Sequence, residues 1–133
     1  MIVERQAQWL FRVNAVTNWV LAPKAIIDPV GAALWYGGAH PNYPSVIRLW
    51  ASLVFMFGIM FWDTSTNVLE KRHLVRYNWL EKTITATVVT VGFIAGDVPI
   101  RLMVLIFLTN WLWIPAIAYY DLALRRVAKA SRA

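Results

Sequence analysis

The chain has 133 residues, 59% of them hydrophobic and 8 of them Trp, whereas a soluble domain has about 45 to 50% apolar residues, so we expect one transmembrane domain covering residues 1–133. It contains no Cys, which excludes disulfides, thiolate-bound zinc, iron–sulfur clusters and covalent haem attachment. The formal net charge is +6, but the cations lie in short blocks beside apolar runs, where they favour membrane orientation and anionic lipid contacts over nucleic-acid binding.

The first predicted span, residues 7–22, is the most polar of four. Asn14, Thr17 and Asn18 share one side of a helix at about 100° per residue, and the opposite side is mostly valine. An amide that faces hydrocarbon loses hydrogen bonds worth about several kcal/mol, so we expect this side to face other helices. Arg12 and Lys24 lie near the two ends and can reach the membrane interfaces.

A short amphipathic segment, residues 24–35, follows Pro23, which is expected to end the first helix. Lys24 and Asp28 are four residues apart and can pair, while Trp35 and Tyr36 can anchor the segment at the outer surface. The pattern favours a surface helix. A lid over an outward-facing cavity is the alternative.

Three further apolar runs, residues 46–62, 80–95 and 100–120, complete an all-α, integral membrane four-helix bundle. Breakers separate them: residues 37–44 before the second span, and Gly96, Asp97 and Pro99 before the fourth. The charged segment before residue 80 predicts a short surface helix that runs into the third span. Pro115 predicts a kink in the fourth span.

The distribution of cations predicts that both termini are cytoplasmic. One set of span ends carries ten Lys and Arg residues: Arg5, Arg12, Lys71, Arg72, Arg76, Lys82, Arg125, Arg126, Lys129 and Arg132. The opposite set carries three, Lys24, Arg48 and Arg101. A multi-pass protein of a bacterial inner membrane fits this asymmetry.

A candidate ligand-binding site follows from polar and aromatic residues inside the predicted spans. Its members are Asn14, Asn18, Asn110, Trp111 and Trp113. The amides would hydrogen-bond a ligand and the two indoles would form an apolar wall. The other interpretation is that the amides only join helices, each contributing about 0.6 to 2 kcal/mol. We favour this second interpretation because no ionisable group is expected deep in the bundle.

Charged residues near the span ends form a second candidate set, of interfacial ion pairs: Arg48, Asp63, Glu81, Lys82, Asp97, Arg101 and Asp121. Fixing the register of the helices explains these pairs more simply than acid–base catalysis. His40 and His73 lie outside the spans, so we expect no metal site and no cofactor. No nucleophile has a base beside it, and we expect no catalytic residue.

Gly92 and Gly96 form a G-x-x-x-G pattern at the end of the third span. Small residues at this spacing let two helix backbones approach closely. The contact could lie within the bundle, or it could join the chain to a second copy or to other membrane-protein subunits.

The layout resembles the small four-helix membrane proteins of the DoxX-like group. The matching elements are a polar first helix followed by a proline-broken amphipathic segment, Arg48-Leu49 opening a second helix that ends at Asp63, and a basic connection with Lys82 opening the third. The resemblance implies a four-helix bundle with an accessory role in a membrane complex, and it brings no catalytic residue.

Two functions are therefore open at the level of the sequence. The favoured one is a non-enzymatic accessory or assembly subunit of a larger membrane complex, because aromatic and small residues suit helix contacts and deep ionisable groups are not expected. The alternative is a small membrane carrier or binding protein for a lipid-like or quinone-like molecule.

Overall fold

The computed structural model describes residues 2–130. Its elements in chain order are α1 (Ile2–Ile27), α2 (Pro29–Trp35), α3 (Pro44–Thr66), α4 (Arg72–Ala95), α5 (Ile100–Ile106), the π-helical turn η1 (Phe107–Trp111) and α6 (Trp113–Ala130). Residues 2–130 contain no strand, so the predicted all-α class is confirmed. Arg132, which contributes to the predicted cation asymmetry, lies outside these residues.

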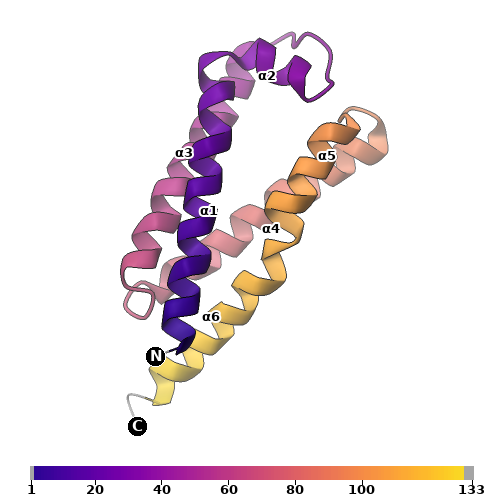
Figure 1. Ribbon diagram of the computed structural model, residues 1–133. Coiled ribbons are helices and arrows are strands. Elements are labelled where there is room, and N and C mark those ends of the chain that lie inside the picture. The colour runs from indigo at the N-terminus through magenta and orange to yellow at the C-terminus, as the bar shows by residue number, and fades with distance from the viewer. Residues whose placement is uncertain (1, 131–133) are drawn as a thin grey trace.

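The helices form two packed pairs (Figure 1). α1 lies along α3, and α4 lies beside the rod made by α5, η1 and α6. The pairs approach each other at the end that holds both ends of the described chain and the α3–α4 turn, and they diverge toward the end that holds α2 and the α4–α5 turn (Figure 1). The molecule therefore has one closely packed end and one splayed end.

The main core fills the closely packed end. It consists of Ala7, Phe11, Ala15, Phe61, Val68, Val75, Ile117 and Leu124, all at most 1% exposed. Phe11 of α1 and Phe61 of α3 stack with their ring centroids 6.3 Å apart. Gly58 allows the two helices to approach closely, because a Cβ atom there would lie 2.6 Å from Nε1 of Trp19. This contact makes α1 and α3 a tightly joined pair.

Two helical stretches are long and apolar enough to cross a membrane, judged by length and composition alone: α3 and the continuous rod Ile100–Ala130. α1 and α4 are more polar, since α1 contains Arg12 and Lys24 and α4 contains Glu81 and Lys82. Large apolar side chains are exposed along α3 and the rod, for example Met56 and Val104. Membrane association is thus supported, and a count of four spans stays a prediction.

Two predicted helix boundaries are wrong. Pro23 does not end the first helix, because α1 continues through it to Ile27. The side chain of Arg48 stabilises this extension, since its Nε donates to the carbonyl oxygen of Ile26 at 2.8 Å. The second is the start of the third span, predicted at residue 80: residues 67–71 form a turn, and the predicted surface helix and the span form one continuous helix, α4, from Arg72.

α2 is the short helix predicted after the first span. It begins directly after Asp28, whose carboxylate accepts a hydrogen bond from the backbone N–H of Gly31 at 2.9 Å. Pro29 occupies the first helical position, where its missing N–H costs nothing. Position on an outer membrane surface remains a prediction for this helix.

The fourth predicted span is irregular just before Pro115. η1 replaces a regular α-helical turn, and the N–H of Leu112 donates to the carbonyl oxygen of Phe107 at 3.2 Å, five residues earlier. A wider turn of this kind is often found at functional sites. Thr109 and Asn110 both lie on this turn.

Candidate ligand-binding site

Lys82 lies near the middle of α4 and is 2% exposed. Its Nζ atom is 3.3 Å from Oδ1 of Asn18, to which it donates a hydrogen bond, and 3.8 Å from Oε2 of Glu81. The ammonium group also lies 5.1 Å from the centroid of the Phe61 ring. A buried charge is costly unless it is paired, and these three neighbours supply the pairing.

The expectation that no ionisable group lies deep in the bundle is therefore wrong. Glu81 is 9% exposed and lies beside Lys82 near the middle of α4. The expectation failed because α4 begins at Arg72 rather than at residue 80, so Glu81 and Lys82 lie well inside the helix. Consecutive residues are about 100° apart on a helix, and a broad inner face can hold both. The pair is internal to the bundle rather than interfacial.

Asn18 links three helices at this point. Its Nδ2 donates to the carbonyl oxygen of Val54 on α3 at 3.2 Å, and its Oδ1 accepts from Lys82 on α4. The polar side of α1 faces the other helices, as predicted, because Asn14 and Asn18 are 1% and 3% exposed while Val20 is 71% exposed.

Asn110 approaches the same region from η1. Its Nδ2 donates to Oγ1 of Thr109 at 3.0 Å, and that hydroxyl in turn donates to the carbonyl oxygen of Leu105 at 2.8 Å. Within the described chain, Oδ1 of Asn110 and Oε2 of Glu81 are buried and have no hydrogen-bond partner. Buried acceptors in proteins are rarely left unpaired, so these two atoms require an explanation.

A small cavity lies between these residues. Its volume is about 40 Å³, and it is lined by Asn18, Leu21, Ala22, Ala25, Tyr36, Trp50, Ala51, Val54, Glu81, Lys82, Thr85, Leu105, Ile106, Thr109 and Asn110. The polar groups come from α1, α4 and η1, and the remaining walls are mostly apolar. Tyr36 is half-buried at the end of α2, and burial raises the pKa of its phenol above the usual value.

A larger apolar groove adjoins the cavity. Its volume is about 600 Å³, and its lining residues are Trp9, Arg12, Val13, Val16, Thr17, Val20, Leu21, Trp62, Leu105 and Thr109. Three residues, Leu21, Leu105 and Thr109, line both the groove and the cavity. The polar centre of the bundle is thus next to an open apolar channel between α1 and the α5–η1 segment.

The predicted ligand-binding residues divide into two groups. Asn18 and Asn110 meet at the cavity. Asn14 lies elsewhere, with its Nδ2 bound to the carbonyl oxygen of Leu10 in its own helix at 3.0 Å. The indole N–H groups of Trp111 and Trp113 bind Thr90 Oγ1 at 3.1 Å and the Leu108 carbonyl at 3.0 Å. Neither indole lines the cavity or the groove.

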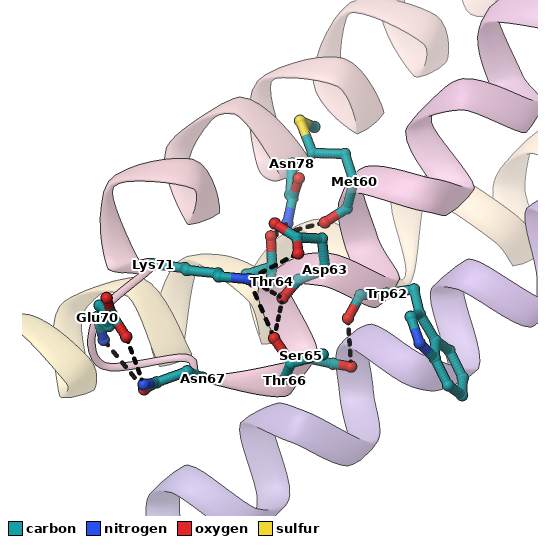
Figure 2. A network of polar contacts seen from close by, with 10 residues as sticks. All are labelled: Met60, Trp62, Asp63, Thr64, Ser65, Thr66, Asn67, Glu70, Lys71 and Asn78. Carbon is teal, nitrogen blue, oxygen red and sulfur yellow. Dashed lines mark hydrogen bonds and ion pairs between the residues drawn. The ribbon is translucent and has the colours of Figure 1, made fainter.

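Asp63, one of the residues predicted to form ion pairs, pairs with Lys71 in the α3–α4 turn (Figure 2). The Lys71 Nζ lies 2.6 Å from Oδ1 of Asp63 and 3.1 Å from Oγ1 of Thr66. In the same turn Asn67 donates to Glu70 at 2.7 Å. These contacts close the end of α3 and have no connection with the cavity.

Asp121 forms its ion pair one helical turn along α6, with Arg125 at 2.7 Å. At the splayed end, Arg48 and Arg101 donate to the backbone carbonyls of Ile26 and Trp35 instead. No ion pair of Arg48, Asp97 or Arg101 occurs among residues 2–130.

The pair of glycines at the end of α4 has a role inside the chain. A Cβ atom on Gly92 would lie 2.8 Å from Cγ2 of Val98, so Gly92 packs against its own α4–α5 turn. Gly96 has φ +85°, the left-handed conformation in which glycine commonly ends a helix. Self-association through these residues remains a prediction.

The sequence indicates Asn18 and Asn110 by their depth in the predicted spans, whereas it predicts Glu81 and Lys82 in interfacial ion pairs near the end of a span. In the part of the chain that is described, no group of three or more His, Asp or Glu residues could hold a metal ion. Comparisons with family models, curated proteins and solved structures found no match to this chain.

Proposed function

We propose that this protein is a membrane protein that binds a small amphipathic molecule, lipid-like or quinone-like, as a binding protein or carrier. The observation that carries the proposal is the cavity lined by Asn18, Glu81, Lys82 and Asn110, which shares three lining residues with an apolar groove. Mostly apolar walls with a few polar groups are typical of ligand sites. The polar head would occupy the cavity and the apolar part would occupy the groove.

The membrane setting is the second part of the proposal. We place α1, α3, α4 and the α5–α6 rod across a bilayer, with both termini on the cytoplasmic side of a bacterial inner membrane. Both ends of the described chain lie at the same end of the bundle, in support of this topology (Figure 1). Because Lys82 is buried, it no longer counts among the ten cations predicted at the cytoplasmic span ends. The remaining nine Lys and Arg residues against three at the opposite ends still favour this orientation.

The buried ion pair changes which function is favoured. The accessory-subunit hypothesis depends on helix contacts by aromatic and small residues and on an expected lack of deep ionisable groups, and Glu81 and Lys82 remove the second argument. Ionisable residues inside a membrane protein are rare and usually mark a functional site. The ionisable groups of the cavity contact each other and the side chains of Asn18 and Thr85, and we propose that they bind a ligand rather than catalyse a reaction.

Mass spectrometry of protein extracted in mild detergent tests this proposal. We expect a small molecule to accompany the wild type and the Asn14→Leu variant, because Asn14 lies outside the cavity. The Asn110→Leu variant should stay folded and retain less of the molecule than the wild type, because the free oxygen of Asn110 would contact the ligand.

Two results would contradict the proposal. One is a wild-type protein that carries no small molecule under any gentle extraction. The other is a stoichiometric membrane-protein partner with no bound small molecule, which would support the accessory-subunit function instead.

A further inference from the structure

The polar atoms around the cavity determine which chemical group a ligand head can have. This inference rests on the proposed function. We infer that the head group is an uncharged hydroxyl, which donates to Glu81 or Asn110 and accepts from Lys82. A hydroxyl has one donor and two acceptor sites, and two residues that line the cavity beside Lys82, Glu81 and Asn110, each have a buried acceptor without a partner.

The free acceptor on Asn110 is fixed by its neighbours. Thr109 has one proton, and it is used in the hydrogen bond to the carbonyl oxygen of Leu105. Thr109 can therefore only accept from Asn110, so the NH₂ group of Asn110 must face Thr109. The carbonyl oxygen of the amide is then the atom left without a partner.

Glu81 supplies the second free acceptor. Its Oε1 accepts from the Thr85 hydroxyl at 3.5 Å, whereas Oε2 is 3.8 Å from Lys82 Nζ, which is an ion-pair distance beyond hydrogen-bond length. Lys82 has three N–H donors, and among residues 2–130 its one hydrogen bond is to Asn18. The ammonium group therefore keeps a donor for a ligand oxygen.

Size and charge restrict the ligand further. A cavity of about 40 Å³ holds only a few water-sized groups, at about 10 to 15 Å³ for each. The rest of the molecule must pass Leu21, Leu105 and Thr109 into the groove. Because Glu81 and Lys82 carry opposite charges, the pair favours an uncharged head over a second cation.

Binding of three probes that share one alkyl chain tests this inference: dodecanol, its methyl ether and dodecylamine. The ether keeps an oxygen acceptor and lacks the donor. We expect the wild type in detergent, measured by native mass spectrometry, to bind the alcohol about tenfold or more tightly than the ether, since a hydrogen bond to a charged group is worth that much. The amine should bind more weakly than the alcohol.

The variant that removes the acceptor used by the hydroxyl should lose this preference. In that variant, either Glu81→Gln, which keeps the shape of the side chain, or Asn110→Leu, the alcohol and the ether should bind within about threefold of each other. Asn14→Leu is the matched control, since it removes a buried amide outside the cavity. It should keep the full preference for the alcohol.

The outcomes separate this inference from the proposed function. Equal binding of the alcohol and the ether by the wild type would overturn the hydroxyl head group and leave amphipath binding intact. Tighter binding of the amine, or loss of preference in Asn14→Leu as well, would also overturn it. Absence of binding by all three probes would contradict the proposed function itself.

Discussion

At the scale of single residues, the central feature is a charged pair inside a largely apolar bundle. The side chains of Lys82 and Glu81 are 2% and 7% exposed. Such a pair gives little net stability relative to apolar residues of the same size, because desolvation offsets most of the attraction. A requirement for function explains its presence better than a requirement for stability does.

Removing one partner of this pair should destabilise the bundle strongly. Lys82→Met leaves the Glu81 carboxylate buried without a cation, and the free energy of unfolding in detergent should fall by about 3 to 5 kcal/mol. The double variant Glu81→Leu/Lys82→Met should recover most of this loss, because no uncompensated charge remains. Chemical unfolding followed by circular dichroism measures both.

The ion pair of Asp63 and Lys71 provides the control. The Asp63 side chain is 54% exposed, and Asp63→Asn should cost about 1 kcal/mol or less. If Lys82→Met cost no more than this exposed control, the pair would not be buried as described. If the double variant were as unstable as Lys82→Met, the unpaired Glu81 carboxylate would not be the cause of the lost stability.

At the scale of the helices, two contacts shape the site. α1 and α3 are held together by the close approach at Gly58, while η1 brings Thr109 and Asn110 to the cavity. α4 supplies both charges from the middle of a continuous helix. The site therefore depends on packing between the two helix pairs as well as on the individual residues.

Helix identity and the inward side of α1 could be predicted from the sequence, because the period of the polar residues is visible locally. Asn18 belongs to this polar side of α1, and Asn110 is indicated by its depth in the predicted fourth span. The start of α4 could not be predicted, because a charged segment such as residues 72–76 is equally typical of a surface helix that leads into a span. The contact between Lys82 and Asn18 joins residues 64 positions apart, so no local pattern signals it.

At the scale of the whole molecule, the arrangement separates two kinds of surface. Both ends of the described chain and the α3–α4 turn share the closely packed end, with most of the cations (Figure 1). The splayed end holds α2, Arg48 and Arg101. The cavity extends from Glu81 and Lys82 near the middle of α4 to Tyr36 at the end of α2.

This asymmetry predicts the topology. A reporter enzyme that is active only outside the cytoplasm, fused after Ala133, should stay silent, because cation-rich span ends remain in the cytoplasm. The same reporter inserted in the turn at residues 38–43, between α2 and α3, should be active. Activity of the C-terminal fusion would contradict the topology.

The central claim is that an amphipathic molecule lies with its head in the cavity and its chain in the groove. A long-chain alcohol with a photoreactive group in the chain, bound to the protein in lipid nanodiscs and mapped by mass spectrometry, tests this most directly. We expect cross-links to concentrate on residues 13–21 and 105–109, and excess dodecanol to suppress them. Cross-links spread over the exposed apolar face of α3 in proportion to its exposure, and unaffected by dodecanol, would contradict the account.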